Sequence, residues 1–210
     1  MLKDDFFDDD TIAVAQRLLG KVLCVKHQQQ WLMARIIETE AYYINDKSSH
    51  ASLGFTEKRK GLFMAPGTIY MYYSRAGDSL NISTRGEGNA VLIKSGYPYL
   101  NHPDEKAMIA TMQALNPPHN NKGVRPIEKL CGGQTLLCRS LGLKVKTWDQ
   151  KNFSKNTFFI KDVGEQPHYI YQTQRLGINP ERDSHLPYRF IHGDYGQYCT
   201  KKPPKTAKKI

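Results

Sequence analysis

The stretch WLMARIIETEAY, residues 31–42, is the run from which the fold can be built outward. It is apolar over most of its length and then alternates, so that Glu38, Glu40 and Tyr42 recur at every second position. Side chains alternate across a β-strand with period two, and these three would therefore share one face. The strand-like run KVLCVK (21–26) precedes it across the short polar connection HQQQ, and the two runs together predict a β-hairpin.

Further strand signals follow this hairpin. They are GTIYMYY (67–73), LNIST (80–84) and AVLIKS (90–95), separated by the turn-prone clusters SRAGDS and RGEGN. Their spacing predicts an antiparallel meander. Later strands are expected within residues 157–163, 168–177 and 188–193.

Three segments have the apolar spacing of helices. The first, 11–20, follows the cap candidates Asp10 and Thr11 and carries an apolar stripe of Ile12, Ala15, Leu18 and Leu19. The second, 105–115, follows Asp104 as its expected cap, and the third lies within 127–143. Gly132 and Gly133 mark a break or a close approach in the third segment. Strands grouped without regular βαβ alternation predict a single α+β domain over 1–193.

The charge balance favours polyanionic partners. Lys and Arg number 30 against 20 Asp and Glu, which gives a formal net charge of +10. Charge alone does not separate nucleic-acid binding from a merely soluble basic protein. Part of the surplus lies in the ending KKPPKTAKKI, which predicts a basic, flexible tail over 194–210 that touches phosphates non-specifically.

Several classes of protein are excluded by composition. No stretch approaches the roughly 20 apolar residues of a membrane span, so we expect a cytoplasmic protein with no membrane partner. The cysteines lack paired CxxC spacing, which argues against structural zinc and a four-cysteine iron-sulfur cluster. We expect reduced thiols, mostly in the core, with neither a metal nor a cofactor. The four positions are Cys24, Cys131, Cys138 and Cys199.

The acidic strand face at 38–42 has more than one interpretation. Two acids beside a tyrosine could form an acid/base site, whereas periodicity alone favours a solvated strand face. Paired glutamates are also typical of glycoside hydrolysis, where two carboxylates flank the scissile bond. Glu38 and Glu40 are only two residues apart on one strand, however, and no second acid cluster is evident. The following segment, 43–66, is long and polar and carries Lys58, Arg59 and Lys60, which is typical of a functional loop.

The ordered blocks of the chain resemble the alkyladenine (3-methyladenine) DNA glycosylase family. The blocks are ETEAY, His50 after a polar insert, a basic segment leading into GLFMAPGTIYMYY, then LNIST and GEGNAVLIK, with LCRSLGL, RLGI and PYRFI after them. The resemblance covers roughly residues 5–193. It implies a curved antiparallel β-sheet with flanking helices and a protruding β-hairpin, and a monomer that acts on double-stranded DNA containing damaged purines.

The resemblance also assigns roles to residues. Glu40 matches the general base that activates the water attacking C1′, without a covalent intermediate. Tyr42, His50 and Tyr72 match the aromatic pocket around the flipped base, where stacking contributes about 1–3 kcal/mol per base. Asn81 matches the pocket asparagine that excludes the exocyclic amine of guanine. Flipping itself costs a few kcal/mol, least for a damaged base.

Two departures from the family pattern concern the DNA contacts. At the hairpin tip, where the family has a tyrosine, this chain has SRAGDS and is one residue shorter, so that Ser74 or Arg75 would occupy the tip. We take Arg75 as the candidate intercalating residue. Lys94 stands where the family has Arg, which keeps the charge for phosphate but loses the planar fork. The basic run 58–60 supplies the expected phosphate contacts, and the protein would be nucleoid-associated when on DNA.

Two other functions remain as alternatives. The first is a catalytically weak or inactive DNA-binding member of the same fold, against which the retention of the pocket residues argues. The second is an RNA-binding module, which would need the aromatic RNP blocks or GxxG clamp that the sequence lacks.

Overall fold

The computed structural model describes residues 1–74, 77–119 and 123–210. Within these ranges the strands form one nine-stranded sheet in the order β3-β4-β5-β2-β8-β7-β9, while β1 pairs with β2 and β6. Each of these pairings is antiparallel. The strands are β1 (Val22–His27), β2 (Gln30–Tyr42), β3 (Ile69–Ser74), β4 (Gly77–Ser83), β5 (Ala90–Pro98), β6 (Phe158–Lys161), β7 (Ile170–Thr173), β8 (Arg189–His192) and β9 (Lys208–Lys209). The α+β prediction, the hairpin and the meander are therefore confirmed.

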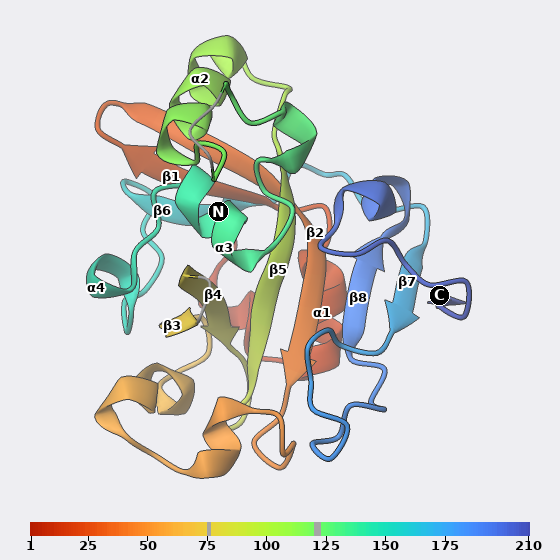
Figure 1. The fold of residues 1–210 in the computed structure, drawn as a ribbon. Coiled ribbons are helices and arrows are strands. Elements are labelled where there is room, and N and C mark those ends of the chain that lie inside the picture. The colour runs from red at the N-terminus through yellow and green to blue at the C-terminus, as the bar shows by residue number, and fades with distance from the viewer. Residues whose placement is uncertain (75–76, 120–122) are drawn as a thin grey trace.

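The long strand β2 is the centre of the sheet. Its first half pairs with β1, and its second half lies between β5 and β8 (Figure 1). The register against β5 shifts on either side of Glu38, which is the signature of a β-bulge. Glu40 then faces Leu92 on β5 and Arg189 on β8. A strand with neighbours on both sides is rigid, so the predicted catalytic acid is mounted on a fixed backbone.

The helices pack on the sheet from both sides. Figure 1 shows α1 (Thr11–Leu18) behind the sheet, and α2 (Glu105–Leu115) and α3 (Gln134–Ser140) before its upper part. A short helix, α4 (Val145–Trp148), contacts β3. Among the described residues, no helix is long and apolar enough to cross a membrane.

Helix capping follows the sequence at one position and departs from it at another. The Asp10 carboxylate accepts hydrogen bonds from the backbone N–H groups of Ile12 and Ala13, as an N-cap does. Asp104 makes no side-chain cap, because its backbone (φ −95°, ψ 23°) is not in the extended conformation that aims a cap. The predicted stripe of α1 is also partly wrong, since Val14 is buried and Ile12 is only half-buried.

The segment 43–66 contains two 3-10 helices, His50–Leu53 and Glu57–Phe63, at the lower edge of the molecule in Figure 1. The loop 174–187 lies beside it, although more than a hundred residues separate them in sequence. Lys47 N–H donates to Asp183 Oδ2 at 2.9 Å, and Arg182 Nε donates to the carbonyl of Lys47 at 2.7 Å. These two segments close the lower ends of β2 and β5.

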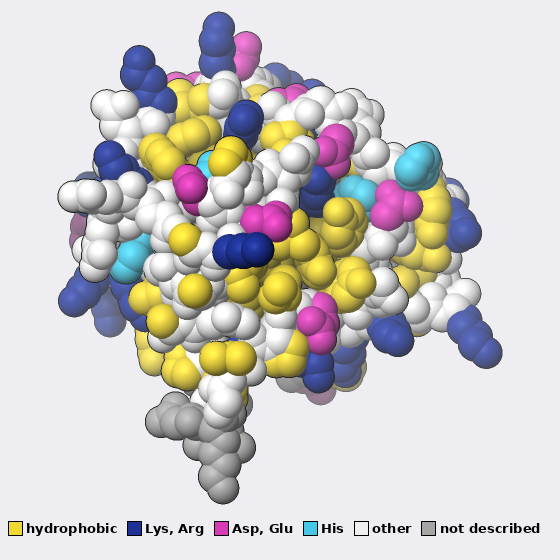
Figure 2. Space-filling model, turned by 90° about the horizontal axis from the view of Figure 1, so that it is seen from above, with side chains coloured by type: hydrophobic (Ala, Val, Ile, Leu, Met, Phe, Trp, Pro, Cys, Tyr) yellow, Lys and Arg dark blue, Asp and Glu magenta, His cyan; other side chains and the backbone are white. Residues whose placement is uncertain are grey.

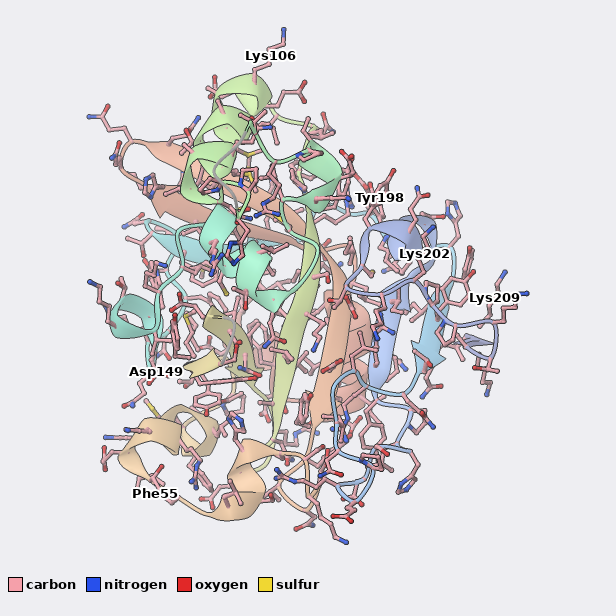
Figure 3. All side chains as sticks on the ribbon, in the orientation of Figure 1. Phe55, Lys106, Asp149, Tyr198, Lys202 and Lys209 are labelled. Carbon is pink, nitrogen blue, oxygen red and sulfur yellow. The ribbon has the colours of Figure 1, made fainter. Side chains whose placement is uncertain are left out.

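The basic C-terminal segment contacts the domain along its length. Thr200 donates its N–H to Glu38 Oε2 at 3.0 Å, and β9 pairs with β7. Figure 3 places Lys202 and Lys209 on the same side of the molecule, near β8 and β7. The flexibility predicted for 194–210 stays a prediction. Figure 2 shows charged side chains of both signs interspersed on the face seen from above, so the positive surplus is not gathered there.

Candidate active site

A cavity of about 240 Å³ lies where segments 43–66 and 174–178 meet the sheet. It is smaller than the roughly 300–1,000 Å³ of pockets for drug-sized ligands, which suits one planar ring system. We call it the central cavity. Its lining comprises Tyr42, Ser48, Ser49, His50, Leu62, Tyr70, Tyr72, Asn81, Ala90, Leu92, Lys94, Gln134, Leu176, Gly177 and Ile178. The structure thus brings four residues predicted for the base pocket to one place.

Glu40 lies beside the central cavity and is 0% exposed. Its Oε2 accepts the Tyr42 hydroxyl at 2.8 Å and lies 3.5 Å from Lys94 Nζ. Its Oε1 accepts the N–H of Leu176 at 3.1 Å. A buried carboxylate held by two hydrogen-bond donors and one ion pair has a fixed orientation, which is what a group acting on one bound molecule requires.

Tyr42 lines the cavity with its ring and contacts Glu40 with its hydroxyl. Burial, first, and then the neighbouring Glu40 carboxylate raise the pKa of the Tyr42 phenol well above its usual range. The phenol is therefore neutral at physiological pH and acts as a hydrogen-bond donor. Its ring is a flat apolar surface of the kind on which a base can stack.

His50 and Tyr72 form a second aromatic surface of the cavity. Their ring centroids are 4.3 Å apart at an interplanar angle of 64°. His50 Nδ1 is 3.0 Å from the Tyr70 hydroxyl, which fixes the imidazole. Burial, first, and then the guanidinium groups of Arg59 and Arg182 lower the pKa of His50. The ring is therefore neutral at pH 7 and can either donate or accept a hydrogen bond.

Tyr70 also lines the cavity, although the sequence analysis named only Tyr72 on this strand. It alternates with Tyr72 on β3, and their rings stack at 5.9 Å. Because side chains two apart share a strand face, the choice of Tyr72 for the pocket already implied the neighbouring position of Tyr70.

The polar floor of the cavity comes from β4 and α3. Asn81 is buried and donates from Nδ2 to the carbonyl of Tyr70 at 3.3 Å. Gln134 donates from Nε2 to Ser79 Oγ at 2.8 Å. Sequence reasoning missed Gln134, because the break at Gly132 and Gly133 identified where α3 begins but not which side chain would face a cavity.

Glu38 does not join Glu40 in an acid pair. Its Oε1 accepts Arg189 Nε at 2.6 Å, and its Oε2 accepts the hydroxyl of Ser95 at 2.5 Å. Both glutamates are fully buried, so the solvated strand face favoured by periodicity is wrong. Strand β8 pairs with β2 in the sheet and brings a buried cation, Arg189, to Glu38, while Thr200 donates its N–H to Glu38 Oε2.

The predicted DNA-contact residues lie in different settings. Lys58 and Lys60 are exposed, and Lys60 Nζ is 3.9 Å from Glu57. The Arg59 guanidinium donates to the carbonyls of Leu53 (2.9 Å) and Gly54, which closes that turn. Lys94 is 12% exposed and faces Glu40.

The hairpin of β3 and β4 carries a large exposed aromatic ring beside its turn. Ser74 belongs to the strand and donates from Oγ to the carbonyl of Gly77 at 2.9 Å. Arg75, the candidate intercalating residue, lies outside the described residues. Tyr73 is 74% exposed and pairs in register with Asp78. The sequence analysis did not name Tyr73. Because Tyr73 follows the pocket residue Tyr72 on the same strand, its side chain points to the opposite face, away from the pocket.

Nothing in the described ranges groups three or more His, Cys, Asp or Glu side chains for a metal. The central cavity offers aromatic faces and amide groups, with the oriented Glu40 carboxylate beside it. Such a set can hold a planar heterocycle by stacking and present a carboxylate at its edge.

Known proteins share this sequence over nearly its whole length. The model of the methylpurine-DNA glycosylase family matches residues 5–195. A relative from Pseudomonas aeruginosa is 54% identical over 202 residues, which cover 96% of this chain and 84% of the relative. A relative from Pseudomonas syringae is 54% identical over 96% of this chain and 90% of its own length. One from Chlorobium luteolum is 32% identical over 90% of this chain and 91% of its own. All three are provisionally named 3-methyladenine DNA glycosylases. The chain belongs to the methylpurine-DNA glycosylase family.

Proposed function

We propose that this DNA glycosylase flips an alkylated or deaminated purine out of duplex DNA and hydrolyses its N-glycosidic bond with a water activated by Glu40. The observation that carries the proposal is the fully buried Glu40 carboxylate beside a cavity lined by aromatic rings. A base inside a duplex cannot reach such a cavity unless it leaves the stack.

The chemistry follows from the position of the carboxylate. Glu40 takes a proton from the water as its oxygen bonds to C1′, and the electron pair of the C1′–N bond leaves with the base. The bond breaks with oxocarbenium character, and the negative charge of the carboxylate stabilises that cation. Because water is the nucleophile, no covalent enzyme intermediate forms, and we expect no cleavage of the DNA strand.

The cavity walls account for selection of the base. Tyr42 on one wall and His50 with Tyr72 on another sandwich the purine, and stacking is favoured for an electron-poor alkylated ring. The Asn81 amide nitrogen donates one hydrogen bond to the carbonyl of Tyr70. The rest of its amide group would then face the base. This arrangement supports exclusion of a purine with an exocyclic amine at that edge.

Two surfaces would hold the opened duplex. Lys58 and Lys60 carry exposed positive charge for phosphates, in addition to the basic tail, whereas Lys94 offers its charge only at the cavity beside Glu40. Tyr73, the most exposed of the large apolar side chains described, stands beside the hairpin turn at the end of the strand that carries Tyr72. It can fill the space that a flipped nucleotide leaves, in place of Arg75, the residue taken from the sequence for that role.

The test is base release from duplex DNA carrying a single 3-methyladenine, 7-methylguanine, hypoxanthine or ethenoadenine. The parent protein should release at least one of these and leave an abasic strand that breaks only on alkaline treatment. Glu40→Gln should bind the lesion duplex but lose excision by at least about a hundredfold, the lower range for a general base. Glu128→Gln, an exposed acid, serves as the matched control. Unchanged excision by Glu40→Gln would contradict the role of Glu40.

The alternative function, a catalytically weak or inactive DNA-binding member, has a distinct outcome in the same assay. It would bind lesion and undamaged duplexes with equal affinity and release no base. The same assay thus distinguishes an error about the role of Glu40 from an error about the proposed function.

A further inference from the structure

Glu40 receives a backbone hydrogen bond from a segment far away in the sequence. The N–H of Leu176 donates to Glu40 Oε1 at 3.1 Å. Leu176 lies in a stretch without regular structure, and Leu176, Gly177 and Ile178 also line the central cavity. Such a loop can hold a carboxylate only if it is itself anchored.

The preceding residue, Arg175, is that anchor. Its side chain is 0% exposed, and its guanidinium donates to the carbonyl of Ala41 at 2.9 Å and pairs with Asp46. The guanidinium carbon also lies 4.5 Å from the ring centroid of Tyr42 and 5.4 Å from that of Tyr188. Its Nε is buried and has no hydrogen-bond partner among the described residues, in keeping with a planar group held between two rings.

The partner of Arg175 organises the opposite wall of the cavity. Asp46 Oδ1 accepts the N–H of Ser48 at 2.9 Å and its hydroxyl at 2.6 Å, and the carbonyl of Asp46 accepts the N–H of Ser49. Ser49 caps the 3-10 helix that begins at His50. One buried ion pair therefore joins the loop that holds Glu40 to the segment that carries the aromatic wall.

We propose that Arg175 is a positioning residue for the reaction: its guanidinium, clamped by Asp46, Ala41 and Tyr42, fixes the Leu176 N–H against Glu40. This inference rests on the proposed function, because the orientation of Glu40 matters for a water-activating base. Arg175 does not line the cavity and acts only through Leu176, Tyr42 and Asp46.

The first arm of the test measures excision at saturating enzyme together with the affinity for lesion duplex. Arg175→Met should lower the excision rate constant about ten- to hundredfold and change the affinity by less than about threefold, since small displacements cost rate rather than binding. Arg35→Met is the matched control. Arg35 is also buried, pairs with Glu165, donates to a backbone carbonyl and contacts two tyrosine rings, but lies outside the cavity lining. Equal rates for the two variants, or a parallel loss of affinity, would overturn the proposal.

Arg175→Met leaves the buried Asp46 without its counter-charge and can unfold the chain, so the doubly neutral Arg175→Met/Asp46→Asn variant is measured beside it. A second arm needs no activity and uses protein labelled with 15N at leucine. Glu40→Gln should shift the Leu176 amide resonance in the parent and leave it unshifted in the doubly neutral background. An equal shift in both backgrounds refutes the anchor. If the parent releases no base, the proposed function fails. The Leu176 amide measurement still decides whether Arg175 holds the Leu176 N–H against Glu40.

Discussion

Replacing Glu38 by Gln removes the counter-charge of a buried cation. Arg189 is 1% exposed, and its guanidinium is held by Glu38 Oε1 at 2.6 Å and by the carbonyl of Lys201. Breaking a buried pair by removing one partner costs about 3–5 kcal/mol, because the remaining charge stays uncompensated. For a chain of this size, such a loss lowers the melting temperature by about 6–20 °C.

Urea and thermal unfolding of the parent and Glu38→Gln measure this loss. A second variant, Glu38→Gln/Arg189→Met, removes the stranded cation while the Gln oxygen still accepts from Ser95 and Thr200, so it should be more stable than Glu38→Gln alone. Excision by folded Glu38→Gln should stay within about threefold of the parent, since truncating a structural charge affects stability rather than the transition state. A stability loss below about 1 kcal/mol, the level of an exposed pair, would refute the reasoning. A loss of excision with stability intact would restore the acid-pair interpretation.

Three further outcomes follow from the structure. Burial lowers the pKa of His192 from 6.5 to about 4. Between these pH values the unfolded chain binds a proton that the folded chain does not, so the free energy of unfolding should fall as the pH drops from about 6.5 to about 4. His192→Gln should flatten this dependence, as read from urea midpoints at pH 7 and 5, whereas an unchanged slope would assign the dependence elsewhere. Lys58→Ala and Lys60→Ala should each lower the slope of log affinity against log salt by about 1 for any DNA sequence, and a sequence-dependent loss would contradict phosphate contact. Tyr73→Ala should reduce excision about tenfold, because one stacking ring is lost, and should change the melting temperature little, because the ring is exposed. Phe55→Ala, which removes another exposed ring at the lower margin of Figure 3, is the control. Equal excision rates for the two variants would remove Tyr73 from the mechanism.

Local patterns predicted the elements of the fold well. The runs at 67–73, 80–84 and 90–95 became β3, β4 and β5 because strand propensity and turn chemistry agreed there. The cap at Asp10 was readable because an N-cap depends on neighbouring residues alone. Asp104 has the same side chain but a different backbone conformation, which no local pattern reports.

The sequence by itself determined which residues could meet at a site. Side chains alternate with period two on a strand, which places Glu38, Glu40 and Tyr42 on one face. The ordered blocks that resemble the family then single out Glu40. Only the tertiary structure decided that the two glutamates differ. Strand β8 brings Arg189 to Glu38, while the loop after β7 brings the N–H of Leu176 to Glu40. These partners lie more than a hundred residues away in the sequence. A buried carboxylate is costly in a medium of low dielectric unless donors or cations reach it, so its partners decide its role. Periodicity records the direction in which a side chain points, but not what the rest of the chain places in front of it.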